Sequence, residues 1–284
     1  MCRPMKNKLF LTQKRENVYD GEEKQKTGKG GDGMKEKLYT IELNDALKAG
    51  DECPFCYLER NLEQAAIEFV LGSSYMESDI RDQTDRQGFC RKHTKMMYDY
   101  GNTLGNAWIL KTRMKYLRGE LKKQMDSFSP EQASFFDKWK KKDSAKSSVG
   151  TWIRQEECHC YVCSRVDNTY QRVLDTFVYQ VKHEREFLDM VKNSKGFCIH
   201  HFADLVDACE NGLGKKEQDE IFPLLFQQME KELNRIQEDI DWLIEKYDYV
   251  NKDKDWKNSR DAVQRTMQKI VGGYPADPVF QGNK

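Results

Sequence analysis

The chain contains the pattern Cys53-Pro54-Phe55-Cys56 … Gly88-Phe89-Cys90-Arg91-Lys92-His93 and repeats it as Cys160-Tyr161-Val162-Cys163 … Gly196-Phe197-Cys198-Ile199-His200-His201. The offset between the copies is 107 residues at the first cysteine and 108 residues at the last histidine. A matching offset at both ends of a pattern indicates a duplicated unit. Two copies are too few for a solenoid, so we expect a pseudo-symmetric pair.

The composition around this repeat divides the chain into five predicted regions. A polar, lysine- and serine-rich stretch separates the copies and predicts a linker. The predicted regions are a disordered leader or mis-assigned start at 1–33, a first helical metal-binding unit at 34–142, the linker at 143–150, a second helical metal-binding unit at 151–271, and a flexible tail at 272–284.

Apolar residues outside the repeated pattern follow helical periodicity. Residues 57–70, 104–125 and 229–247 each place apolar side chains three and four positions apart. The last segment has the regular alternation of a long bundle or coiled-coil helix. Few segments alternate with a period of two, so the sequence predicts an all-α fold.

The repeated pattern predicts two metal sites. Zinc in structural sites is held by four thiolate and imidazole ligands, and three cysteines with one histidine are a common set. Ligands three positions apart across the first turn of a helix point the same way, and Pro54 suits the first helical position. A sharp turn is expected at Gly88 and Gly196. The predicted ligands are Cys53, Cys56, Cys90, His93, Cys160, Cys163, Cys198 and His201.

Several alternatives to this ligand set stay open. Cys158 competes with Cys160 and His200 with His201, although neither competitor reproduces the copy-to-copy spacing. A redox dithiol, structural disulfides and an iron–sulfur cluster are alternatives to two zinc ions. Cys209 is expected to be a core thiol and His183 a solvated residue. The sequence does not decide whether a metal is held within one copy or across both.

A structural role is favoured over a catalytic one. Catalytic zinc usually keeps one position open for water, whereas three cysteines and one histidine close a tetrahedral shell. No glutamate recurs in the arrangement expected of a general base beside such a metal. The sequence therefore assigns no catalytic residue, and an enzyme is not the favoured class.

Net charge and hydropathy restrict the partners. The 284 residues carry 47 basic and 47 acidic side chains, a balance that argues against a nucleic-acid partner. A lysine cluster at 138–146 keeps nucleic-acid binding as a weaker alternative. No apolar run reaches the length of a membrane span, and no export signal is recognisable, so a cytoplasmic protein is expected. Translation starting at Met34 is a second interpretation of residues 1–33, because Gly30-Gly31-Asp32 can be encoded by a ribosome-binding sequence.

Ordinary residues beside the ligands resemble a known family. Residues 34–41 and 44–46, Leu71 to Glu77, the two Gly-Phe-Cys motifs and the stretch from Asp241 to Tyr249 are similar to the uncharacterised bacterial family DUF6062. The resemblance covers about residues 35–271 and implies no particular activity.

Three functional hypotheses follow. The first is a zinc-stabilised helical protein that binds a protein partner. The second is a thiol- or metal-based redox sensor or enzyme, and the third is nucleic-acid binding. In the second copy, the aromatic residues Tyr161, Tyr170, Phe177, Tyr179 and Phe187 either fill the core or line a groove between the copies.

Overall fold

A computed structural model of the chain describes residues 38–129 and 147–282. Within these ranges the chain forms eleven α-helices, two short 3-10 helices and no strand, so the predicted all-α class is confirmed. In chain order the elements are α1 (Thr40–Lys48), α2 (Pro54–Gly72), η2 (Ser74–Met76), α3 (Ser78–Gln87), α4 (Arg91–Tyr100), α5 (Thr103–Asp126), α6 (Ser148–Glu156), α7 (Tyr161–His183), α8 (Arg185–Asn193), α9 (Ile199–Gly212), α10 (Lys215–Lys246), η3 (Tyr249–Asn251) and α11 (Ala262–Val271).

Some sequence-based expectations fall outside the described residues. They are the leader at 1–33 with its alternative start at Met34, the lysine cluster at 138–146 and the first part of the linker at 143–150. The last residues of that predicted linker belong to α6, which begins at Ser148.

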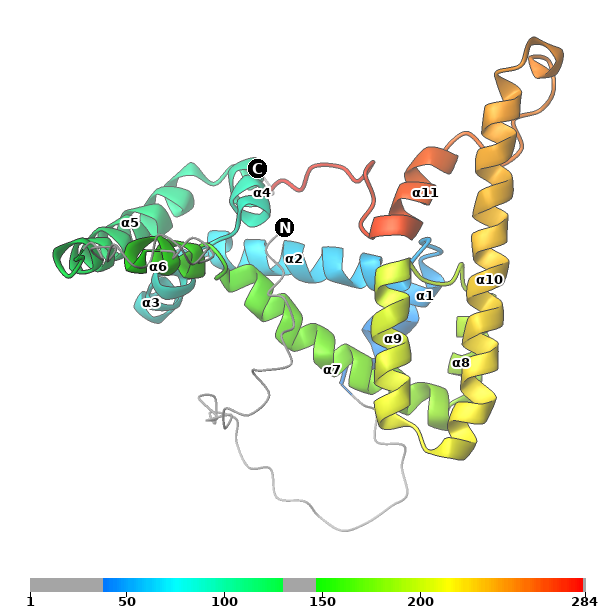
Figure 1. The fold of residues 1–284 in the computed structure, drawn as a ribbon, viewed down its shortest axis with the longest axis horizontal. Coiled ribbons are helices and arrows are strands. Elements are labelled where there is room, and N and C mark those ends of the chain that lie inside the picture. Colours follow the sequence, from blue (N-terminus) through cyan, green and yellow to red (C-terminus); the bar gives the residue numbers. More distant parts are fainter. Residues whose placement is uncertain (1–37, 130–146, 283–284) are drawn as a thin grey trace, which may run out of the picture.

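Helices α2 and α7 lie against each other and run in opposite directions (Figure 1). The first turns of α2 share a buried cluster with Phe177, which lies in the second half of α7. The end of α2, at Val70 and Leu71, shares another cluster with Val162 in the first turn of α7. This antiparallel pair therefore links the two buried clusters of the fold.

The larger cluster surrounds Phe177, whose side chain is fully buried. Its ring lies 5.8 Å from that of Phe55, 5.5 Å from Phe187 and 6.2 Å from Phe197, mostly in edge-on geometry. Helices α1, α8, α9 and α10 complete this cluster. Of the five aromatic residues singled out in the second copy, four are buried and Tyr179 is half-buried, which supports the core interpretation.

The smaller cluster joins the end of α2, the start of α7, and residues of α4 and α5. Met97 of α4 and Ile109 of α5 are buried there against Val70 and Val166. Both clusters thus combine residues from before and after the predicted linker. The division into units at 34–142 and 151–271 stays a prediction about the sequence.

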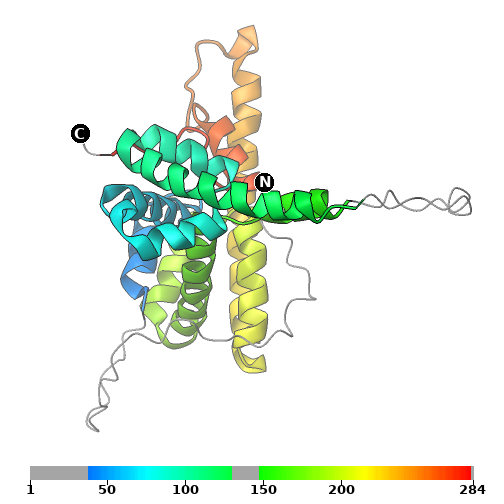
Figure 2. The ribbon, with the colours of Figure 1, turned by 90° about the vertical axis from the view of Figure 1, so that its left-hand side faces the viewer.

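Helix α5 confirms the helix predicted at 104–125, but its expected apolar face is largely exposed. Leu110 is 53% exposed, Met114 61% and Met125 55%. Its fully buried residues, Gly105 and Ile109, lie in the first turns. The second half extends away from the two clusters, beside α6 (Figure 2).

Helix α10 includes the predicted helix at 229–247 except its last residue, and its apolar seam is buried over only part of its length. Met229 and Ile236 are buried, whereas Tyr247 is 81% exposed. The C-terminal part of α10 projects beyond the body of the fold (Figure 1). Among the described residues, no helix combines the length and apolar character needed to cross a membrane.

The segment after α11, expected as a flexible tail at 272–284, makes specific contacts as far as Gly282. Arg60 on α2 donates two hydrogen bonds of 2.9 Å to Asp277. The ring of Phe280 lies 5.6 Å from that of Tyr100, whose carbonyl oxygen accepts a 2.9 Å bond from the Gly282 N–H. These contacts connect the segment after α11 to α2 and α4.

Replacing Phe177 by alanine should lower the free energy of unfolding by about 3–5 kcal/mol, because it removes a large buried ring and leaves a cavity. Phe128→Ala is the matched control, since Phe128 is 43% exposed and should change stability by less than about 1 kcal/mol. Urea denaturation followed by circular dichroism measures both. Equal losses for the two variants would contradict the placement of Phe177 at the centre of the core.

Candidate metal centres

The eight predicted ligands come together in two groups of four. Within each group the side-chain nitrogen and sulfur atoms lie within 4.8 Å of one another. We call the group Cys53, Cys56, Cys198 and His201 site 1, and the group Cys90, His93, Cys160 and Cys163 site 2.

Each site combines ligands from both copies of the repeated pattern. The C-x2-C pair of the first copy meets the C-x2-H pair of the second in site 1, and site 2 has the reverse combination. The within-copy alternative, which the sequence left open, is not what the structure shows. The reason is that α2 ends at Gly72 and carries the chain about 24 Å away from Cys56 before the second pair of its own copy. Because α7 runs antiparallel to α2, it brings the C-x2-H pair of the second copy back to Cys53 and Cys56.

All four ligand pairs occupy the same position on a helix. Cys53, Cys90, Cys160 and Cys198 are the N-cap residues of α2, α4, α7 and α9, and the second ligand of each pair is the third residue of the helix. The sulfur of Cys198 accepts a 3.4 Å bond from the His201 N–H, as an oxygen does in ordinary N-caps. Each site therefore lies where two helix N-termini converge, and their positive ends stabilise thiolates.

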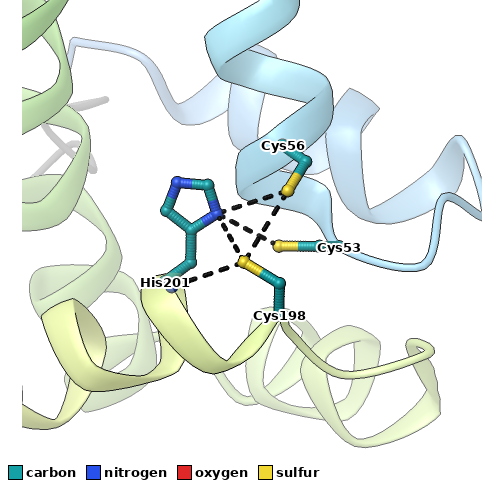
Figure 3. Close-up of side chains that lie close together, drawn as sticks. All are labelled: Cys53, Cys56, Cys198 and His201. Carbon is teal, nitrogen blue, oxygen red and sulfur yellow. Dashed lines mark hydrogen bonds between the residues drawn. The ribbon is translucent and has the colours of Figure 1, made fainter. Parts of the chain in front are cut away.

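The separations in site 1 fit a single tetrahedral ion (Figure 3). His201 Nδ1 lies 3.4, 3.5 and 3.2 Å from the sulfurs of Cys53, Cys56 and Cys198, and the sulfurs of Cys56 and Cys198 are 3.7 Å apart. Standard zinc bond lengths place neighbouring sulfur ligands about 3.8 Å apart and a nitrogen and a sulfur about 3.5 Å apart. All four side chains are at most 2% exposed.

Site 2 has the same geometry with less burial. His93 Nδ1 lies 3.2 Å from the sulfurs of Cys90 and Cys160 and 3.4 Å from that of Cys163. The sulfurs of Cys90 and Cys163 are 3.9 Å apart. His93 and Cys160 are buried, whereas Cys90 and Cys163 are half-buried. The more accessible site is therefore site 2.

Two glycines turn the chain into the C-x2-H pairs, as predicted. Gly88 has a φ of 60° and Gly196 a φ of 72°, which other residues rarely adopt. At Gly88 a Cβ atom would also lie 2.8 Å from the guanidinium of Arg113. The second position before each of these cysteines is thus restricted to glycine.

Two glutamates that the sequence motifs did not indicate face the histidines. Glu59 Oε2 lies 3.2 Å from His201 Nε2, and Glu63 Oε1 lies 3.3 Å from His93 Nε2. A carboxylate on the far nitrogen orients a ligating imidazole and increases its basicity. Both glutamates are on α2, three and seven positions after Cys56, so they lie on the same helix face as that ligand. This spacing is the signal in the sequence by which they could have been found.

The pKa shifts show that each histidine faces an acidic thiol. Burial alone lowers the pKa of His93, but its hydrogen bonds with Cys160 and Glu63 outweigh this and raise it to about 10. The hydrogen bond with Cys163, together with that to His93, lowers the pKa of Cys160 to about 3. In site 1 the bonds from Cys53 and Cys56 likewise lower the pKa of Cys198. Metal binding would displace the protons that the histidines and the other thiols retain.

The other cysteines and histidines of the described residues lie outside the two sites. Cys158 is exposed, and His200 points to Asp204 at 3.6 Å. Cys209 is fully buried in the larger cluster, where burial raises the pKa of its thiol to about 12. His183 is exposed beside the ring of Tyr179, at 4.5 Å. The two groups of four thus contain Cys160 and His201, and not Cys158 or His200.

The crossed arrangement predicts an unusual result for double variants. Cys56→Ser with His201→Ala removes two ligands of site 1 and should leave one bound metal ion per chain. Cys56→Ser with His93→Ala removes ligands of the same copy but of different sites, and should leave none. Elemental analysis of the monomeric fraction measures both, and the opposite pattern would show that each copy holds its own ion.

Comparisons with known proteins assign the chain to a family without adding an activity. Comparison with curated proteins and with solved structures finds no match. The model of the family of unknown function DUF6062 matches residues 34–277, a range that includes every residue of both sites. The chain therefore belongs to the family DUF6062, whose function is unknown.

Proposed function

We propose that this protein is a zinc-stabilised helical scaffold of the cytoplasm that acts by binding another protein. The observation that carries the proposal is the pair of Cys3His groups, each of which joins helix N-termini from the two halves of the chain. Zinc bound there would cross-link the fold twice. The proposed ligands are the eight residues of sites 1 and 2, with one ion in each site.

Donor type and spacing favour zinc over an iron–sulfur cluster. Three thiolates and one imidazole are a common zinc set, and the donor separations in both sites match one tetrahedral ion. A cluster distributes its ligands over two or more iron atoms. The compact arrangement therefore suits a single ion.

A closed ligand set supports a structural role over catalysis. Four protein donors fill a tetrahedral shell and leave no position for water or substrate. Glu59 and Glu63 face the far nitrogens of the histidines, so they orient ligands rather than activate a water molecule. A redox dithiol is disfavoured because Cys53 and Cys56 are both buried.

The proposed binding role rests on the large apolar side chains that the helices expose. The metal sites and the two clusters occupy the interior, and the helices present large apolar side chains outside it, including Leu104, Met114 and Met267. Thiolate ligands persist in a reducing compartment, which supports the cytoplasm as the location.

Protein purified without added metal should contain about two zinc ions per chain. Removing them with a chelator should lower the melting temperature by more than about 10 °C, because each ion holds two helix N-termini together. Mass spectrometry under native conditions gives the stoichiometry, and calorimetry gives the temperature. Iron, or unchanged melting after complete metal removal, would contradict the proposal.

Thiol reactivity separates the structural role from the redox alternative. In the metal-loaded protein an alkylating reagent should modify the exposed Cys158 quickly and the six ligand cysteines slowly, because metal-bound thiolates are protected. Adding a chelator should make the ligand cysteines reactive. Peptide mapping reads out each cysteine, and rapid labelling of Cys53 or Cys56 before chelation would favour the dithiol hypothesis.

A further inference from the structure

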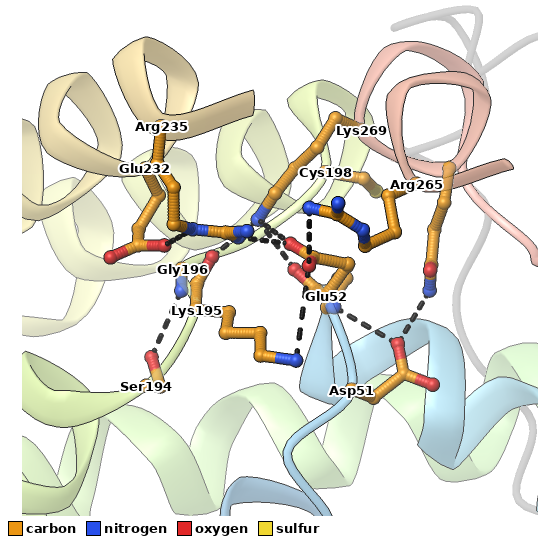
Figure 4. Close-up of polar contacts among 12 residues, drawn as sticks. Asp51, Glu52, Ser194, Lys195, Gly196, Cys198, Glu232, Arg235, Arg265 and Lys269 are labelled. Carbon is orange, nitrogen blue, oxygen red and sulfur yellow. Dashed lines mark hydrogen bonds and ion pairs between the residues drawn. The ribbon is translucent and has the colours of Figure 1, made fainter. Parts of the chain in front are cut away.

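A buried lysine from the last helix ties together the two loops that carry the ligands of site 1. Lys269 on α11 is 1% exposed. Its Nζ donates a 2.6 Å hydrogen bond to the carbonyl oxygen of Glu52 and a second bond to that of Lys195 (Figure 4). Glu52 immediately precedes Cys53, and Lys195 begins the turn that leads to Cys198.

Site 2 joins the corresponding loops by a backbone hydrogen bond. The N–H of Tyr161, which follows Cys160, donates a 2.9 Å bond to the carbonyl oxygen of Gly88, two residues before Cys90. In site 1 the residue that follows the first cysteine is Pro54, which has no N–H to donate. The loops of site 1 therefore need another donor.

We propose that Lys269 is a positioning residue of site 1, that it replaces the missing backbone bond, and that it makes this site the slower of the two to release its metal. This inference rests on the proposed function, because it concerns the metal held by site 1. An ammonium group has three N–H donors, so it bridges two carbonyl oxygens at once.

The carboxylate of Glu52 lies beside Lys269 and is shared with other cations. Its Nζ lies 3.5 Å from Glu52 Oε2, and the same carboxylate is paired with Arg235 and lies 3.8 Å from Arg265. Glu52 and Lys269 are both almost fully buried, so the pair is fixed in position. Zinc with three thiolates and a neutral imidazole has a net charge of −1, which a nearby ammonium offsets.

The end of α11 adds a second contact to the same site. The Gly273 N–H donates a 3.3 Å bond to the sulfur of Cys56. Gly272 has a φ of 78°, and a Cβ there would lie 3.5 Å from the sulfur of Cys198. Helix α11 and the turn after it therefore cover site 1, whereas Cys90 and Cys163 of site 2 are half-buried.

The test measures metal release at each site separately in the full-length, zinc-loaded protein. A chelator and an alkylating reagent are added together, and peptide mapping follows labelling of Cys53, Cys56 and Cys198 against Cys90, Cys160 and Cys163. In the wild type, the site 2 cysteines should be labelled first. Lys269→Met should accelerate labelling of the site 1 cysteines about 10- to 100-fold and leave site 2 unchanged.

Lys246→Met is the matched control. Lys246 is also a buried lysine whose Nζ bonds two carbonyl oxygens, those of Asn251 and Lys252, but it contacts neither site. Its replacement should leave both labelling rates at the wild-type values. A general loss of stability would accelerate both sites together, which separates a positioning role from a merely structural one.

Three results would overturn the inference. They are equal labelling rates at the two sites of the wild type, wild-type rates in Lys269→Met, and equal acceleration of both sites in that variant. The first result is measured on the wild type, so it can overturn the inference even if Lys269→Met does not fold. Wild-type protein that contains no zinc would instead contradict the proposed function.

Discussion

The convergence of helix N-termini at sites 1 and 2 is the constraint on which the rest of the structure depends. An N-cap residue and the third residue of a helix both point toward the free N–H groups of the first turn. Cysteine and histidine at these positions form half of a tetrahedral site, so each site needs two helices that meet end to end. Because the two pairs of each group come from opposite halves of the chain, a metal ion bound there would constrain how the halves pack.

Helix α2 carries the largest share of this arrangement. It supplies Cys53 and Cys56 to site 1, and Glu59 and Glu63 to the histidines of sites 1 and 2. Its two ends also belong to different buried clusters. One helix therefore couples both metal sites to both clusters, and a shift of α2 along its axis would disturb all four. The length of α2, and the face that carries Cys56, Glu59 and Glu63, therefore have to suit the geometry of the two sites as well as the packing of apolar side chains.

Features that depend on local sequence could be predicted, and those that depend on packing could not. The Cys53–Cys56 spacing, the start of α2 at Pro54 and the turn at Gly196 are local consequences of helix capping and of backbone φ. The crossing of the ligands depends on the antiparallel packing of α2 and α7, which leaves no pattern in either copy. Lys269 was missed because it lies far along the chain from the loops that it joins. The exposure of the apolar face of α5 could not be predicted, because periodicity shows that a helix has an apolar face but not whether another element covers it.

Crossed ligand sets also change what the loss of one metal ion does. If each half held its own ion, removing one would loosen that half alone. In the crossed arrangement each bound ion would link both halves, so while one site was filled the halves would stay tethered and the ligands of the other site would remain at high effective concentration. An ion that binds again at the emptied site would then meet four ligands that are already close together. A partly exposed site 2 is therefore compatible with a persistent fold, because the buried site 1 keeps Cys90 and His93 near Cys160 and Cys163.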